Sequence, residues 1–201
     1  MATSTRKKAI EIWHSDVPAG DKEQLAKILF RYENPPGTKV FAGSQDSIGI
    51  VMPGLNRIEY DGGYWPVHIT SVHDEDILSW IEDHLSLITL GPRESTYDVL
   101  EDTVINEKNA EALKKAAENC WEAVVKKDLR EFGEHFRGSF QAQIKMFPNM
   151  VSQRTISTIN KYKNTALGWK LSGAGGGGYL IFVSDTPMRG AMKIKIRRKS
   201  P

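Results

Sequence analysis

The sequence has 201 residues, a net charge of +2, 40% hydrophobic residues and 26% charged residues. These values are typical of a globular chain that is long enough for one large or two small domains, and they exclude wholesale disorder. The single cysteine, Cys120, excludes an internal disulfide and suits a reducing compartment. No apolar run reaches the roughly 18–20 residues that a membrane helix needs, so we expect a cytoplasmic protein without a membrane partner.

Basic residues gather near the two ends of the sequence, in "TRKK" (Thr5–Lys8) and "KIKIRRK" (Lys193–Lys199). Neither run belongs to a basic face or to an RNA-binding signature, so no nucleic-acid partner is expected. Solvated ends, with lysines that protect the edge of a strand, account for both runs.

The first third of the chain predicts three helices and one β-hairpin. Asp21 can cap the second helix, and the prolines and glycine of "NPPGT" (Asn34–Thr38) mark a turn through which no helix can continue. The hairpin is predicted from apolar residues that alternate on both sides of "DGG" (Asp61–Gly63). The expected elements are two helical stretches between Arg6 and Tyr32, a short helix through Ile48–Met52, and hairpin strands between Leu55 and Ile69.

The rest of the chain predicts an amphipathic segment, a buried strand, three helices and three strands, in that order. Apolar residues recur at helical spacing along the first two helices, and the aromatic stripe of the second is the pattern of a packed core. Asn106 can cap the first of these helices, and Pro148 ends the second. The expected ranges are "DEDILSWIEDHL" (Asp74–Leu85), "LSLITLG" (Leu85–Gly91), helices over 106–127, 129–147 and 152–162, and strands in "GWKLS", "YLIFVS" and "MKIKIR".

The order of these elements indicates the fold class. Strands, then helices, then strands are typical of an α+β fold with a largely antiparallel sheet. A domain boundary is expected just after the hairpin, which divides the chain into residues 1–73 and residues 74–201.

The stretch "SGAGGGG" (Ser172–Gly178) places five glycines between two strand-like runs, where ordering them costs much backbone entropy. Its spacing matches G-x-G-x-x-G, but the dinucleotide fingerprint needs a following helix and a later acidic residue, whereas "YLIFV" and "RRKS" follow here. A Walker A loop is excluded because no Lys-Ser/Thr follows the glycines. A structural turn, a surface linker and a backbone nest for an anion remain, and the nest best explains the absence of side chains.

A second motif, "AGSQDSIGIVMPG" (Ala42–Gly54), places small residues around Gln45 and Asp46 at a predicted loop-to-helix junction. Asp46 can simply cap that helix. Alternatively, a carboxylate held in a tight, glycine-bounded turn can accept a hydroxyl proton, or orient the hydroxyl for attack on phosphorus. Both interpretations of Asp46 are compatible with the residues alone.

Together the two motifs resemble the GHMP kinases, the superfamily of galactokinase, homoserine kinase, mevalonate kinase and phosphomevalonate kinase. "KLSGAGGGGYLIF" looks like the glycine-rich motif near the C-terminal end of these enzymes, and "GSQDSIGIVMPGLNRIEYDGG" is similar to a segment of the heptose-kinase and fucose-kinase branch. The similarity runs from about Gln24 to Arg198. It implies a GHMP-kinase C-terminal domain, with an antiparallel sheet and helices on one face, preceded by the tail end of the kinase N-terminal domain.

The resemblance implies an ATP-dependent sugar kinase that transfers a phosphoryl group to a sugar hydroxyl, with ATP and Mg as cofactors of the complete enzyme. Asp46 matches the catalytic aspartate of the family, and Ser44 and Gln45 would lie beside the sugar. Arg93, with Ser95, falls in a polar segment that would reach the same pocket, and an exposed arginine is the alternative there. The loop near the phosphates and the substrate comprises Ser172, Gly173, Ala174, Gly175, Gly176, Gly177 and Gly178.

The sequence departs from the family in one respect, because these 201 residues contain no nucleotide loop of the type P-x-x-x-G-L-G-S-S-A. In the family that loop supplies most of the amides that bind ATP. Three interpretations remain: a fragment, one subunit of a split kinase completed by an N-terminal half or a homodimer, or a catalytically inactive ligand-binding or interaction domain. We expect the isolated chain to be inactive without the missing half. The five histidines show no metal-ligand spacing, so no metal site is predicted.

Overall fold

The structure is a computed structural model that describes residues 3–14, 16–39, 41–92 and 98–199. The chain forms two compact units, Met1–Asp74 with Ile196–Pro201 (unit 1) and Glu75–Lys195 (unit 2). The predicted second domain runs from residue 74 to residue 201, whereas the compact unit ends at Lys195 and Ile196–Pro201 belong with unit 1. The Gly54 amide donates a hydrogen bond of 2.8 Å to the Arg197 carbonyl, and this bond connects the last residues of the chain to the rest of unit 1.

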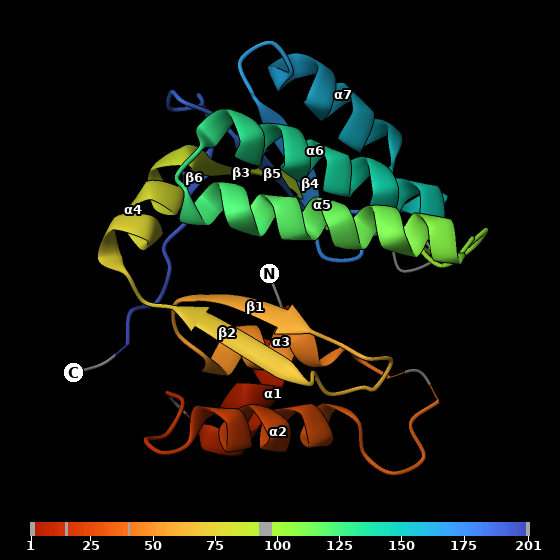
Figure 1. The fold of residues 1–201 in the computed structure, drawn as a ribbon. Coiled ribbons are helices and arrows are strands. Elements are labelled where there is room, and N and C mark those ends of the chain that lie inside the picture. Colours follow the sequence, from red (N-terminus) through yellow and green to blue (C-terminus); the bar gives the residue numbers. More distant parts are fainter. Residues whose placement is uncertain (1–2, 15, 40, 93–97, 200–201) are drawn as a thin grey trace. The chain divides into compact units, whose positions relative to one another are not determined.

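Unit 1 contains three helices and a two-stranded antiparallel hairpin (Figure 1). The predicted cap of the second helix is confirmed, because the Asp21 carboxylate accepts hydrogen bonds from the amides of Glu23 and Gln24. The predicted hairpin is also confirmed, but Trp65 and Val67 belong to the connection and not to the second strand. The elements are α1 (Thr3–Trp13), α2 (Lys22–Glu33), α3 (Ser44–Val51), β1 (Leu55–Glu59) and β2 (His68–Val72).

Helix α3 begins at Ser44, four residues before the predicted start at Ile48. Its N-cap is Gly43, which has no side chain and therefore gives no capping signal in the sequence. The buried side chains of α3 recur at helical spacing, so one face of this helix packs inward. The core of unit 1 is small and consists of Ala9, Ala26, Leu29, Ile48 and Val51.

Unit 2 contains a four-stranded antiparallel sheet in the order β4–β5–β3–β6, and α5 and α6 lie side by side across it (Figure 1). The α+β class and the antiparallel sheet are thereby confirmed. The side chains of Asn106, Asp128 and Ser152 cap α5, α6 and α7. The elements are α4 (Glu75–His84), β3 (Leu85–Gly91), α5 (Glu107–Val125), α6 (Leu129–Met146), η1 (Pro148–Met150), α7 (Gln153–Tyr162), β4 (Gly168–Ser172), β5 (Gly178–Val183) and β6 (Met192–Lys193).

Strand β6 spans only two residues, although the sequence predicts a strand through all of "MKIKIR". After Lys193 the chain leaves the sheet, and the Lys195 ammonium pairs with the buried Glu82 carboxylate at 3.0 Å. This ion pair holds the chain against α4 just before Ile196 enters unit 1.

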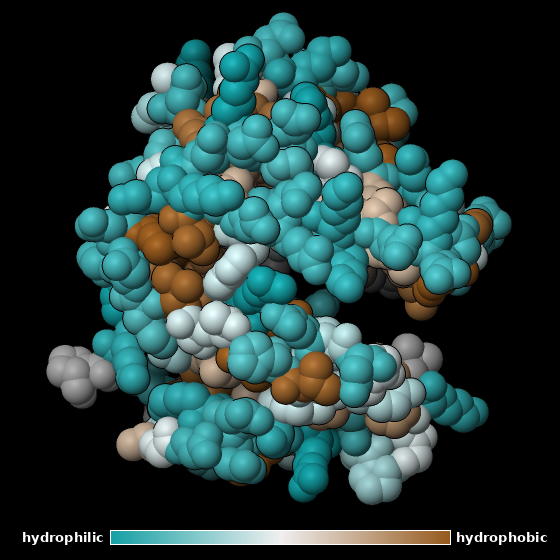
Figure 2. Space-filling model, in the orientation of Figure 1, coloured by the Kyte–Doolittle hydropathy of each residue, from teal (hydrophilic) through white to brown (hydrophobic). Residues whose placement is uncertain are grey.

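Helix α6 packs on β4 through two glycines. A Cβ atom on Gly168 would lie 2.1 Å from the Gly133 carbonyl oxygen, so the helix and the strand approach as closely as backbones allow. Hydrophilic residues cover most of the visible face of α5, as expected for the outer side of the layer (Figure 2). No helix in the described ranges is both long enough and apolar enough to cross a membrane. The core of unit 2 consists of Ile88, Leu90, Val99, Phe140, Met150, Leu171, Leu180 and Phe182.

Candidate functional site

Asp46 is exposed in the first turn of α3, and the serines on either side of it in sequence are buried. Ser44 and Ser47 are 1% and 0% exposed, respectively. Because the N-cap of α3 is Gly43, Asp46 is not the capping residue, and the capping interpretation of this aspartate is wrong. Its carboxylate is left on the outer surface of unit 1.

Ser44 connects the start of α3 to the hairpin. Its hydroxyl donates a hydrogen bond of 2.7 Å to the Tyr64 carbonyl and accepts one of 2.8 Å from the Tyr60 hydroxyl. Both partners lie in the segment that joins β1 to β2. This geometry favours a structural function for Ser44 over the predicted contact with a sugar, because its hydroxyl is buried and already paired.

Glu33, at the end of α2, connects the three helices of unit 1. Its carboxylate accepts a hydrogen bond of 2.7 Å from the Thr5 hydroxyl of α1 and one of 3.3 Å from the Ser47 hydroxyl of α3. No sequence pattern indicates this network, because Thr5 and Ser47 are 28 and 14 residues away from Glu33. The network fixes the turn of α3 from which Asp46 projects.

The surroundings of Asp46 affect its ionisation. Although its side chain reaches solvent, partial burial of the carboxylate raises its pKa above the ordinary value. Partial loss of hydration favours the protonated form, and a carboxylate with a raised pKa is a stronger base when ionised. Gln45, the residue before Asp46, is also exposed. Consecutive helix residues are about 100° apart around the axis, so these two predicted residues share the outer face of α3.

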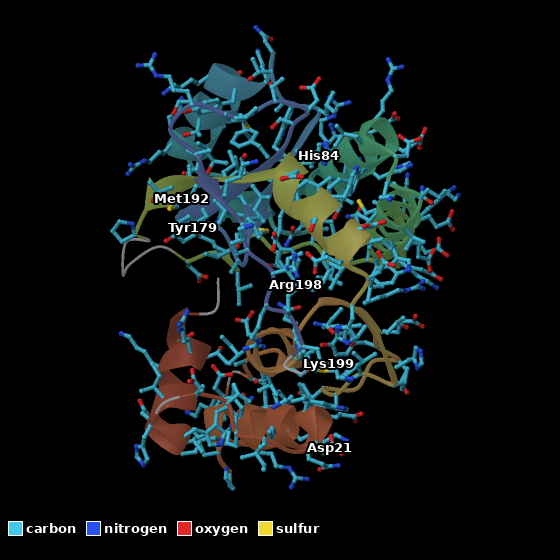
Figure 3. All side chains as sticks on the ribbon, turned by 90° about the vertical axis from the view of Figure 1, so that its left-hand side faces the viewer. Asp21, His84, Tyr179, Met192, Arg198 and Lys199 are labelled. Atoms are coloured by element: carbon cyan, nitrogen blue, oxygen red, sulfur yellow. The ribbon has the colours of Figure 1, made fainter. Side chains whose placement is uncertain are left out.

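The second predicted site is the glycine loop between β4 and β5 in unit 2. The strands pair up to Ser172 opposite Tyr179, so the loop is the connection of an antiparallel hairpin (Figure 3 labels Tyr179). Four glycines of this loop have φ values of 70° to 86°, a region that disfavours other residues. They are Gly173, Gly175, Gly176 and Gly178.

The structure explains one glycine of the loop by close packing. A Cβ on Gly175 would lie 2.5 Å from the Met150 carbonyl oxygen, and the Gly176 amide donates a hydrogen bond of 2.9 Å to that same oxygen. This part of the loop therefore packs on η1, and the Gly176 amide is not available to an anion. Gly173 and Ala174 are exposed and form the exposed corner of the loop. This corner is the part of the predicted anion nest that a ligand could reach.

The remaining predicted residue, Arg93, lies outside the described residues, as does Ser95. At the end of β3, just before that segment, the guanidinium of Arg154 packs against Gly91. A Cβ on Gly91 would lie 2.8 Å from its Nη1 atom. Arg154 belongs to the first turn of α7, and no motif in the sequence singles it out.

Lys170, in the middle of β4, is a further polar residue that sequence reasoning missed. It is half-buried, and its ammonium donates a hydrogen bond to Oε1 of Gln143 in α6. Burial lowers its pKa to about 8, while burial raises the pKa of the nearby Cys120 thiol of α5 to about 12. Strand alternation next to Trp169 and Leu171 predicts a solvent-facing lysine here, but α6 covers the position.

The predicted residues fall into two groups that belong to different units. Ser44, Gln45 and Asp46 share the first turn of α3 in unit 1, and Ser172–Gly178 form one loop in unit 2. Within the described ranges, no three His, Cys, Asp or Glu side chains are grouped so that they could hold a metal ion.

Comparison with solved structures shows that this fold is the fold of GHMP-family kinases. A mevalonate kinase structure matches with a TM-score of 0.61 and 18% identity, over 89% of this chain and 53% of that chain. The structure of L. major mevalonate kinase in complex with R-mevalonate matches with a TM-score of 0.62 and 18% identity, over 83% of this chain and 51% of that chain. A D-glycero-D-manno-heptose 1-phosphate kinase from Bacteriodes thetaiotaomicron has a TM-score of 0.56 and 17% identity, over 88% and 48%.

The predicted resemblance is thus confirmed at the level of the fold. The chain spans about half the length of the solved kinases that it matches. No protein-family model matches the sequence, and no curated protein matches it.

Proposed function

We propose that this chain carries the C-terminal half of an ATP-dependent sugar kinase, which transfers a phosphoryl group from ATP to a sugar hydroxyl in the cytoplasm. Asp46 is the catalytic residue of this proposal, and Gln45 is the neighbour that contacts the sugar. The exposed corner of the glycine loop, at Gly173 and Ala174, lies near the phosphates. Unit 1 corresponds to the end of the kinase N-terminal domain, and unit 2 corresponds to the C-terminal domain.

The observation that carries the proposal is the setting of Asp46. Its carboxylate projects from a helical turn that Glu33 and the buried Ser44 and Ser47 hold in place. A carboxylate held in this way can orient a hydroxyl and accept its proton as the hydroxyl attacks phosphorus. The pKa raised by partial burial supports this function, because it makes the ionised carboxylate a stronger base.

Gly49 gives independent support. It lies three residues after Asp46 on the exposed side of α3, and apart from its chain neighbours and the backbone of its own helix, no described atom comes within 4 Å of the position where its Cβ would be. A glycine inside a helix costs about 0.5–1 kcal/mol relative to alanine, and packing within unit 1 does not require one here. An open space beside the carboxylate is what a sugar substrate would need.

The cofactors fit this chain only in part. ATP supplies the phosphoryl group in the family, and the corner at Gly173 could receive one of its phosphates, because a Cβ there would meet no described atom within 4 Å. Within the described ranges, no three His, Cys, Asp or Glu side chains are grouped around a possible metal position, and in the family Mg²⁺ is held partly by the phosphates of ATP. A complementary N-terminal half would have to provide the remaining contacts, either as a separate subunit or as part of the same polypeptide.

The proposal is tested by Asp46→Asn in the assembled kinase, measured as ADP formation with a panel of sugars and sugar phosphates. We expect kcat to fall by at least about two orders of magnitude, the lower range for general acid–base catalysis, while the Kd of the sugar changes little. Near-normal turnover in this variant would exclude the catalytic function of Asp46. The isolated chain should form no appreciable ADP, and robust activity from it would refute the half-enzyme interpretation.

The alternative is a catalytically inactive ligand-binding or interaction domain derived from such a kinase. Its favouring observation is that these 201 residues contain no family nucleotide loop. Adding the N-terminal half of the kinase separates the two functions, because only the first predicts that phosphorylation appears on assembly. Sugar binding without turnover in the assembled protein would favour the alternative.

A further inference from the structure

Lys170 presents an unusual combination of burial and partners. It lies in β4 opposite Ile181 of β5, and α6 covers it from the side of Gln143. The acceptor of its hydrogen bond is the neutral amide oxygen of Gln143. An ammonium that is taken out of water normally needs a carboxylate partner, so a neutral acceptor leaves its charge uncompensated.

The other groups around Lys170 supply no negative charge. Within the described part of the chain, none of the ion pairs includes Lys170. The thiol of Cys120 in α5 stays neutral at physiological pH, because burial raises its pKa to about 12. These surroundings therefore make the neutral amine of Lys170 much more populated than that of a lysine in water.

We propose that Lys170 is a site of covalent acylation, at which the amine takes a small acyl group from an activated donor of the acyl-phosphate class. The neutral Nζ attacks the acyl carbon, an N–C bond forms, and the C–O bond to phosphate breaks. Inorganic phosphate leaves with the bonding electrons, and the amine releases one proton to solvent. No oxidant or reductant takes part.

The surroundings of Lys170 suit the product as well as the reactant. An amide is neutral and needs no counter-ion, and its single N–H can keep the hydrogen bond to Gln143. The half-buried position of the side chain suits a small acyl group better than a large one. The proposal is independent of the kinase function, because it rests only on residues of unit 2.

The expected selectivity follows from the fraction of neutral amine. With a pKa of about 8, about a quarter of Lys170 is neutral at pH 7.5, against about a thousandth for an ordinary lysine. A less basic nucleophile reacts more slowly, and a Brønsted slope of about 0.4–0.5, as measured for thiols, offsets about one order of magnitude. Lys170 should therefore be acylated about tenfold faster than an exposed lysine.

The test is limited acetylation of the folded 201-residue chain with acetyl phosphate at pH 7.5, followed by mass spectrometry of each lysine. We expect the initial rate at Lys170 to exceed that at Lys114, an exposed lysine of α5, by about tenfold. The rate at Lys170 should level off above about pH 9, once its amine is largely neutral. Equal rates at the two lysines would overturn the proposal.

Gln143→Glu is the matched control, because it changes a neutral acceptor into a carboxylate of almost the same shape. An ion pair with this glutamate should keep Lys170 protonated and reduce its acetylation to the rate of Lys114. Circular dichroism establishes that the variant is folded. If the folded variant is acetylated at Lys170 as fast as the original chain, the electrostatic reasoning is wrong and the proposal fails.

Discussion

Replacing Gly175 by alanine tests whether packing against η1 explains this part of the glycine loop. The residue has φ +86°, and an alanine in that region costs about 1–2 kcal/mol. The new Cβ would also lie 2.5 Å from the Met150 carbonyl oxygen and 2.8 Å from the Met150 Cβ, so the backbone must move. Overpacking of this kind costs about 1–3 kcal/mol, and stretching the bond from Gly176 costs about 1 kcal/mol more. We expect Gly175→Ala to lower the free energy of unfolding by at least about 3 kcal/mol.

Gly173→Ala is the matched control in the same loop. Its φ is +80°, nearly the same as that of Gly175, but nothing lies within 4 Å of its Cβ position. This variant should therefore lose only the conformational part, about 1–2 kcal/mol. Urea unfolding followed by tryptophan fluorescence compares the two variants with the original chain. If the two variants differ by less than about 0.5 kcal/mol, a typical limit for additivity, contact with Met150 does not explain Gly175.

Two further predictions concern Lys170 and Gly49. The pKa of Lys170 is lowered by burial from 10.5 to about 8, so its charge costs the fold up to about 3 kcal/mol below pH 8, and this cost disappears as the pH rises to 10.5. Lys170→Met should therefore raise the free energy of unfolding at pH 7 by about 1–3 kcal/mol and leave it unchanged at pH 10.5. A gain in stability that does not depend on pH would contradict the reasoning. An equal gain from the control variant Lys114→Met would contradict it as well. Gly49→Ala should stabilise the isolated chain by about 0.5–1 kcal/mol in thermal unfolding, yet weaken sugar binding by the assembled kinase. Unchanged sugar affinity would show that the space beside Asp46 is not used.

Elements with a local cause could be predicted from the sequence, and those with a distant cause could not. Asp21 and Asn106 cap their helices as predicted, because capping depends on residues two or three positions away. The early start of α3 was missed because its cap is a glycine. The short β6 could not be foreseen, because its length depends on pairing with β3, which lies far earlier in the sequence.

The candidate site divides in the same way. Asp46 and the loop at Gly173 were recognisable because each belongs to a contiguous motif. The burial of the Ser44 hydroxyl and the partners of Lys170 depend on contacts 16 to 27 residues away. Lys170 also follows the strand alternation that is typical of a solvent-facing residue, and only the helix that covers it shows otherwise.

The membership of Arg197 in unit 1 has a consequence for how the protein is made. Unit 1 is a discontinuous folding unit, since all of unit 2 is inserted between Asp74 and Ile196. During synthesis, the Gly54 amide can bind the Arg197 carbonyl only after the 142 residues between them, at positions 55 to 196, have emerged. Unit 2 is contiguous and can complete its fold first. Unit 1, which carries Asp46, is therefore the last to complete its fold. A chain that ends before Arg197 would lack the hydrogen bond to the Gly54 amide.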